Sequence, residues 1–191
     1  MVYTNEVNSS SFVSISSSLG SRAQTFTNTG PTANIQSVTV YLKNSGSGIG
    51  NLFVVMRSIT GTPGSSATLS GSAIATSNTV SMTGNYASLS AVTFNFSTPG
   101  TALNANTSYA FAVNATGITS GSVDLYYGSP ISGQNSIVTS NNSADTTNDL
   151  AGQVVTVPES GTLALSALAV TLGGLILFIK KWPVRIAPTG H

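Results

Sequence analysis

The segment Ile35–Lys43, with the sequence IQSVTVYLK, alternates apolar and polar side chains with a period of two. In an extended chain Val40 and the apolar residues two positions away share one face, and Thr39 and its alternating neighbours share the other. A helix repeats every 3.6 residues, so this pattern would give a helix no continuous apolar face. The segment therefore predicts a strand with one buried face.

Similar segments rich in β-branched and aromatic residues recur along the chain, separated by Gly, Pro and Asn. They are Ala23–Thr27, Asn51–Ile59, Ala91–Phe96, Ser108–Asn114 and Ser122–Tyr127, with a last short piece at residues 153–157. We expect residues 1–156 to form one all-β domain, an antiparallel β-sandwich or jelly roll. The Gly-rich residues 44–50 are expected to form a hairpin loop.

Two polar stretches of this domain show no such alternation. Ser129–Asp149 contains SNNSADTTND and is expected to form a long loop, because it offers little apolar surface for packing. The N-terminal residues around Glu6 are expected to fray. No segment of residues 1–156 shows a convincing helical period.

Residues 163–179 form an uninterrupted apolar run without a charge. As a helix, this run would be roughly 25 Å long, just enough to cross a bilayer core. Lys180, Lys181 and Arg185 follow it, whereas the preceding flank carries only acids. We therefore expect a single C-terminal transmembrane helix at 163–179, a basic cytoplasmic tail at 180–191, and the β-domain outside the membrane.

The composition also excludes several classes of function. Residues 1–179 hold three basic and five acidic residues, so they offer no basic patch for nucleic acid. The chain has no cysteine, which excludes disulfides, thiolate catalysis and zinc sites ligated by cysteine. The first twelve residues, MVYTNEVNSSSF, lack the basic and apolar regions of an export signal. We expect a signal peptide upstream of Met1; the alternative is a tail-anchored protein whose domain lies in the cytosol.

The C-terminal segment resembles a PEP-CTERM sorting signal, in which a Val-Pro-Glu-Pro motif precedes an apolar helix and a basic end. Val157, Pro158 and Glu159 match, Ser160 replaces the second proline and Gly161 follows. The resemblance implies an exosortase-like processing enzyme as partner, passage through a bacterial inner membrane, and delivery to the cell surface or matrix. Two alternatives remain: a relaxed Leu-Pro-x-Thr-Gly sortase signal, and a plain membrane stalk.

A second resemblance covers most of residues 1–156. The segments AQTFT, IQSVTVYL, GTPGSSATLSGS and FNFSTPGTALNANTSYAFAVNAT occur in the order seen in choice-of-anchor domains, closest to type R. Leu103, Thr107 and Tyr109 carry the Leu-x-x-x-Thr-x-Tyr pattern. The resemblance implies an extracellular β-domain attached to a sorting signal, and it implies no activity.

The residues offer little for catalysis. The sole histidine is His191, so a serine nucleophile in the β-domain would lack its usual base. A glycosidase-type pair of carboxylates would have to combine Asp124 with Asp145 or Asp149. We expect these instead to be solvated loop acids and an outward-facing strand residue. The sequence predicts neither an enzyme nor a cofactor.

Asp145 and Asp149 are the candidate metal ligands, since they lie with Asn142 and Asn148 in the expected polar loop. Carboxylate and amide oxygens are the ligands that calcium accepts. Their spacing matches no defined calcium loop, so a polar surface loop is the simpler interpretation.

Tyr126 and Tyr127 are the candidate sugar-stacking residues. Successive strand residues face opposite sides, so at most one of the two rings is exposed and the other belongs to the core. The β-domain has no tryptophan, which weakens a lectin-like interpretation. We expect a non-catalytic exported surface or extracellular-matrix protein, processed at 157–161. The alternative is a cell-surface carbohydrate-binding module whose partner is an extracellular polysaccharide.

Overall fold

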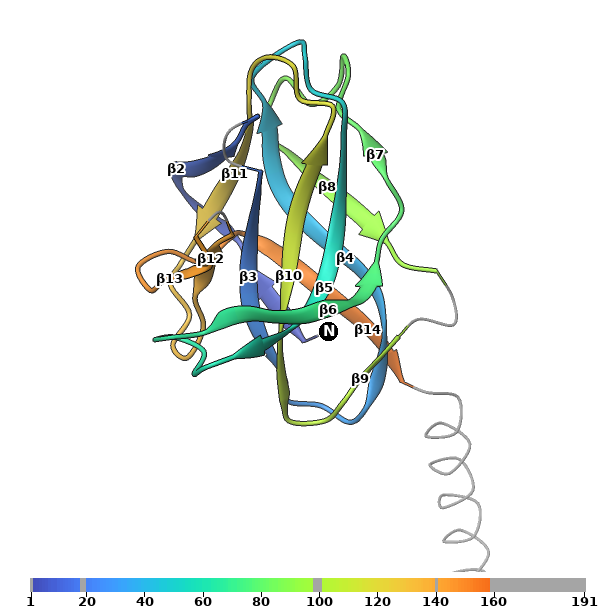
Figure 1. Cartoon of the computed structure of the whole chain (residues 1–191), viewed down its shortest axis with the longest axis vertical. Helices are drawn as coiled ribbons and strands as arrows, with labels where there is room; N and C mark the ends of the chain where they lie inside the picture. The colour runs from blue at the N-terminus through green and yellow to red at the C-terminus, as the bar shows by residue number, and fades with distance from the viewer. Residues whose placement is uncertain (1, 18–19, 98–100, 140, 159–191) are drawn as a thin grey trace, which may run out of the picture. The chain divides into compact units, whose positions relative to one another are not determined.

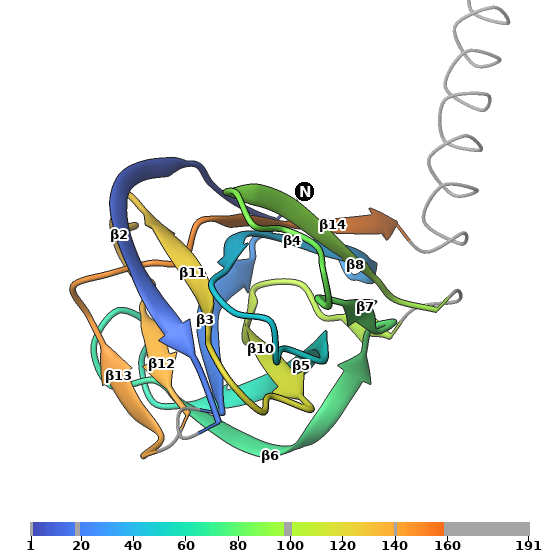
Figure 2. The same cartoon turned by 90° about the horizontal axis from the view of Figure 1, so that it is seen from above.

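The computed structural model describes residues 2–17, 20–97, 101–139 and 141–158, and within these ranges the fold is all-β with no helix. The strands form two antiparallel sheets that face each other around one core, a β-sandwich-like arrangement (Figures 1 and 2). The predicted all-β, antiparallel class is confirmed.

Sheet A has the order β1-β14-β4-β11-β2, with β8 and β9 also paired to β4. Its strands are β1 (Tyr3–Asn5), β2 (Val7–Ile15), β4 (Ala33–Asn44), β8 (Ser90–Asn95), β9 (Ala102–Leu103), β11 (Val123–Gly128) and β14 (Gly152–Pro158). The long strand β4 is central, because Leu42 pairs with Ser90 of β8 and with Leu125 of β11.

Sheet B has the order β13-β12-β3-β10-β5-β6, with β7 also paired to β5. Its strands are β3 (Ser21–Asn28), β5 (Asn51–Thr60), β6 (Thr68–Thr76), β7 (Val80–Ser81), β10 (Thr107–Thr116), β12 (Ser136–Val138) and β13 (Ser143–Asp145). The strand β10 is central here and pairs along its length with β3 and β5.

The core lies between the sheets and is built by the alternation read from the sequence. Sheet A contributes Ile35, Val38, Val40, Leu42, Phe94, Leu125 and Val154; sheet B contributes Phe26, Leu52, Val54, Met56, Phe111 and Val113. Val40 is 1% exposed, whereas Thr39 points outward and its hydroxyl lies 2.8 Å from that of Thr93. Each fully buried aliphatic or aromatic side chain stabilises the fold by roughly 1.5–3 kcal/mol.

The hairpin predicted at residues 44–50 is wrong, because β4 lies in sheet A and β5 in sheet B. These residues cross between the sheets beside a second crossing at residues 117–122. A Cβ at Gly46 would lie 2.6 Å from the Cα of Gly121, and one at Gly50 would lie 2.4 Å from the carbonyl oxygen of Thr116. The glycines are needed because two backbones touch, not because the chain reverses.

The frayed N-terminus and the long loop at Ser129–Asp149 are also corrected. Tyr3 pairs with Val154, so β1 extends sheet A, and the Tyr3 hydroxyl donates to the carbonyl of Leu150. The predicted loop contains β12 and β13, and β12 pairs with β3. In both places the backbone finds a strand partner although the side chains carry little apolar periodicity.

Residues Met1–Val157 form one compact unit. The predicted transmembrane helix at 163–179 and the basic residues Lys180, Lys181 and Arg185 lie outside the described residues. Within the part of the chain that the structure describes, no helix is long and apolar enough to span a bilayer.

Candidate functional site

The sorting motif begins where the last strand ends. Val157 and Pro158 are the final residues of β14, and both side chains are exposed, Val157 by 37%. Pro158 has no backbone N–H and cannot donate to a further ladder bond. Glu159, Ser160 and Gly161 lie outside the described residues, so only the first two positions of the motif have a structural description.

Asp149 is a buried acid, not the solvated loop acid that was expected. It is 2% exposed, and its carboxylate accepts hydrogen bonds from Gln24 Nε2 (2.5 Å) and the backbone N–H of Ile131 (2.5 Å). Gln24 in turn accepts from the N–H of Leu150 at 2.7 Å. Burial raises the pKa of Asp149, although the bonds from Ile131 and Gln24 oppose that rise. Asp149 therefore ties the end of the 129–149 segment to β3.

Asp145 lies on β13 and is only partly buried. It accepts hydrogen bonds from the backbone and hydroxyl of Thr147, at 3.1 and 2.7 Å, and from Asn148 at 3.5 Å. Burial acts to raise the pKa of Asp145, but these hydrogen bonds and the Arg22 guanidinium lower it overall.

The candidate calcium ligands are thus each engaged by protein donors of their own. Asn142 is directed elsewhere, to the backbone of Leu69. In the described ranges, no group of three or more acidic, histidine or cysteine side chains is placed to hold a metal ion.

Asp124 lies on the outer face of sheet A but is not solvated, because it is only 6% exposed. Its carboxylate accepts hydrogen bonds from three serine hydroxyls: Ser14 at 2.7 Å, Ser45 at 2.5 Å and Ser122 at 3.1 Å. Asp124 faces outward, as expected, but the serine hydroxyls cover its carboxylate. Like Asp149, Asp124 joins segments that are distant in sequence.

The two tyrosines divide as the strand alternation predicts. Tyr127 is 7% exposed and belongs to the core, and burial raises the pKa of its hydroxyl. Tyr126 is partly exposed, and its ring centroid lies 5.6 Å from that of Phe12, at an interplanar angle of 44°. Phe12 is 48% exposed. This aromatic pair could hardly be predicted, because Phe12 lies in a serine-rich strand without apolar periodicity.

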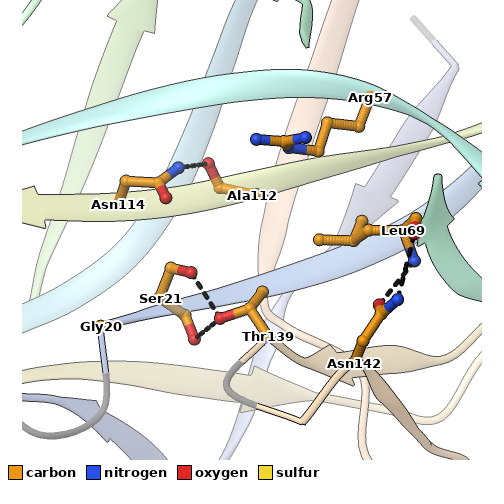
Figure 3. A pocket seen from close by; sticks show the side chains of 8 residues that line it. All are labelled: Gly20, Ser21, Arg57, Leu69, Ala112, Asn114, Thr139 and Asn142. Atoms are coloured by element: carbon orange, nitrogen blue, oxygen red, sulfur yellow. Dashed lines mark hydrogen bonds between the residues drawn. The ribbon is translucent and has the colours of Figure 1, made fainter. Parts of the chain in front are cut away.

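A hollow lies on the outer face of sheet B, the face turned away from the core (Figure 3). It has a volume of about 470 Å³ and is lined by Gly20, Ser21, Arg57, Leu69, Ala112, Asn114, Thr139 and Asn142. We call it the sheet B hollow. Beside it, Ala23, Ala110, Ala112 and Ile137 form a small second apolar cluster against which Ile59 and Leu69 pack.

The two edges of sheet B meet at this hollow. Asn142, in the turn between β12 and β13, has φ of 50° and accepts a hydrogen bond from the N–H of Leu69 at 2.8 Å. Its Nδ2 donates back to the carbonyl of Leu69 at 3.1 Å. Asn is among the few residues that adopt positive φ readily. One asparagine therefore links the turn after β12 to β6 at the opposite edge, and sheet B curls around its own outer face.

No family model matches the chain, and no curated protein matches it either.

Proposed function

We propose that this protein is a non-catalytic, exported cell-surface or extracellular-matrix protein whose C-terminal segment is a PEP-CTERM-type sorting signal. The proposal rests mainly on the order of these parts along the chain: a β-domain, the motif at 157–161, the apolar run at 163–179, and a basic end. An exosortase-like enzyme would recognise the motif while the apolar run holds it at the bilayer surface. The choice-of-anchor resemblance of the β-domain accords with this role.

Two features of the described residues support the proposal. Val157 and Pro158 are exposed at the end of β14, which suits access by a processing enzyme. The carboxylates considered for catalysis, those of Asp124 and Asp149, are buried and engaged by serine hydroxyls, Gln24 and a backbone N–H. Such groups hold the fold together and do not face a substrate.

The test is processing in the native host. The double variant Pro158→Ala, Glu159→Ala is expected to accumulate as full-length membrane-bound protein, whereas the wild type loses everything from about the apolar run onward. Thr156→Ala, which alters a neighbouring β14 residue outside the motif, is the matched control and is expected to process normally. Mass spectrometry of surface protein decides between them. Retention of the Trp182 peptide in full stoichiometry in the wild type would falsify sorting.

A second candidate function, carbohydrate binding, is favoured by the Phe12–Tyr126 pair. Exposed aromatic rings on a sheet face present a flat apolar surface on which sugar rings can stack. A glycan array with wild type, Phe12→Ser and Leu89→Ser tests this, since Leu89 is a similarly exposed apolar residue, at 46%. Saturable binding lost only in Phe12→Ser supports the candidate, and no saturable binding refutes it.

A further inference from the structure

We propose that the sheet B hollow is a binding site for a small hydroxylated carboxylate, of the class of a uronic-acid sugar unit, held by Arg57. The site is separate from both the sorting motif and the Phe12–Tyr126 pair. It rests on the packing and hydrogen-bond chemistry of the hollow alone, so it would stand if the sorting proposal failed.

The hollow exists because the centre of the outer face of sheet B is built from alanines. Ala23 pairs with Ala112 across β3 and β10, and Ala112 pairs with Val55 across β10 and β5. Ala23 and Ala112 are only 0% and 2% exposed, because the edges of the sheet curl toward them. Short side chains beneath a curled sheet leave a volume of about 470 Å³, within the range of small-ligand pockets.

Arg57 supplies hydrogen-bond donors and a positive charge to the hollow. One guanidinium nitrogen donates to the carbonyl of Gly71 at 2.8 Å, which fixes the side chain at the β5–β6 bulge. A guanidinium has five N–H donors, so four remain. None of the described residues that line the hollow is acidic. A charge held in place without a lining partner favours an anionic group, and a planar carboxylate matches a guanidinium in two parallel hydrogen bonds.

Ser21 and Asn114 supply acceptors. The Thr139 hydroxyl donates its single hydrogen to the carbonyl of Ser21 at 2.6 Å, and it is also hydrogen-bonded to the Ser21 hydroxyl. Ser21 must therefore donate in that second bond, which leaves its oxygen lone pairs available as acceptors. Asn114 Nδ2 donates to the carbonyl of Ala112 at 2.8 Å, which leaves Oδ1 as an acceptor. Acceptors of this kind suit the hydroxyl groups of a ligand.

Figure 3 shows Ser21, Thr139 and Asn114 on one side of the hollow and Arg57 and Leu69 on the other. A ligand that satisfies both sides needs a carboxylate for Arg57 and hydroxyl groups for Ser21 and Asn114. The isobutyl group of Leu69, which is partly exposed in the hollow, suits the apolar C–H surface of a sugar ring. A sugar ring that bears a carboxylate combines these three features in one small molecule.

The experiment measures binding of sodium glucuronate to the full chain in mild detergent by calorimetry, with glucose as the neutral probe. We expect saturable glucuronate binding that weakens with added salt, and at least tenfold weaker binding of glucose. Arg57→Gln keeps an amide donor but removes the charge, and it should weaken glucuronate binding at least tenfold. Ala112→Leu should abolish it by filling the hollow. Lys43→Gln removes a charge from sheet A and should bind as the wild type does.

Thermal melting of each variant separates lost binding from lost folding, and Arg57→Gln carries the test if Ala112→Leu does not fold. A glucuronate trimer distinguishes a polysaccharide unit from a free sugar: tighter binding of the trimer points to the polymer, and weaker binding to the free sugar. The proposal is overturned if glucuronate does not bind saturably. It is equally overturned if binding persists unchanged in Arg57→Gln.

Discussion

The strands β4 and β10 hold the same central place in their sheets, yet their outer faces differ. Thr39 and Lys43 project from β4 toward solvent, as a half-exposed sheet requires. The corresponding residues of β10, Ala110 and Ala112, are 0% and 2% exposed. Both strands pack a similar apolar row into the core, so the difference lies entirely on the side away from it. The outer face of sheet A is partly exposed along β4, whereas the outer face of sheet B is buried at the centre of β10.

Outward-facing alanines in a strand thus indicate a covering layer. Alanine has a low preference for strands and gains little on a wet sheet face. In sheet B the cover comes from the sheet itself, because Asn142 joins the β12–β13 turn to Leu69 of β6. The small side chains of this covered face leave the sheet B hollow, whereas Thr39 and Lys43 on β4 face solvent.

The variant with the largest expected effect tests the apolar row that both sheets pack into the core. Val40→Asp should unfold the domain at neutral pH, because a carboxylate among the core side chains has no partner and costs several kcal/mol. Thr39→Asp, on the outer face of the same strand, should change the free energy of unfolding by less than about 1 kcal/mol. Denaturant titration followed by circular dichroism measures both. Equal losses would mean that the faces of β4 are assigned the wrong way round.

Ala23→Asp tests the difference between the sheets directly. Ala23 faces away from the core, as Thr39 does, but lies between Ala112 and Ile137. We expect a loss of about 2–4 kcal/mol, from burial of a carboxylate beside apolar groups. If Ala23→Asp is tolerated as well as Thr39→Asp, the outer face of sheet B is open and the comparison fails.

Asn142→Ala should lower the free energy of unfolding by about 2 kcal/mol, through loss of both bonds to Leu69 and strain at positive φ. Asn142→Gly removes the same bonds but accepts the backbone conformation, so it should cost less. The difference between the two variants measures the backbone strain. Hydrogen exchange at the Leu69 amide should accelerate in both, and unchanged protection there would show that the edges of sheet B do not depend on this residue.

The smallest expected effect is a difference in the pH dependence of stability between variants of Asp145 and of Asp149. Both residues lie near the C-terminal end of Ser129–Asp149, the segment that contains β12 and β13. The pKa of Asp145 is lowered by folding, so its stabilisation is present above the unfolded value of 3.8 and is lost as pH falls through the folded value. The pKa of Asp149 is raised, so its contribution is greatest below 3.8 and is lost as pH rises through the folded value. Relative to wild type, Asp145→Asn should therefore change the slope of stability against pH below 3.8, and Asp149→Asn should change it in the opposite direction above 3.8. Slope changes of the same sign would contradict this assignment.

Much of the sandwich could be predicted from sequence because its central strands carry strong apolar alternation. The alternation predicts strands at Ile35–Lys43 and Ser108–Asn114, and both are confirmed, as are the two faces predicted for Ile35–Lys43. Strands with polar side chains were missed, as in β2 and β12, because their positions are decided by backbone partners far away in sequence. The same reason explains the hairpin predicted at residues 44–50: local glycine content cannot tell a chain reversal from a crossing between sheets.

The candidate site residues divide in the same way, into those whose burial follows from local alternation and those whose burial depends on partners distant in sequence. Alternation predicts that one of Tyr126 and Tyr127 is in the core and that at most one is exposed, and the structure buries Tyr127 and leaves Tyr126 partly exposed. It could not foresee the burial of Asp124 and Asp149, since their partners, Ser14 and Gln24, are more than a hundred residues away. The sheet B hollow could not be predicted either, because it depends on the contact of Asn142 with Leu69, 73 residues away. The alternating alanines of the segment YAFAV do indicate that this outer face is covered.

The position of β14 between β1 and β4 sets an order of events for a chain made from its N-terminus. Until residues 150–158 have emerged, β1 has no strand partner among the described strands of sheet A and the Tyr3 hydroxyl has no acceptor at Leu150. Strand β1 must wait for β14, roughly 150 positions later, and contacts of such long range make folding slow. The edge of sheet A that β14 and β1 complete therefore stays open through most of the synthesis of the β-domain, and closes only after residues 152–158 have been made.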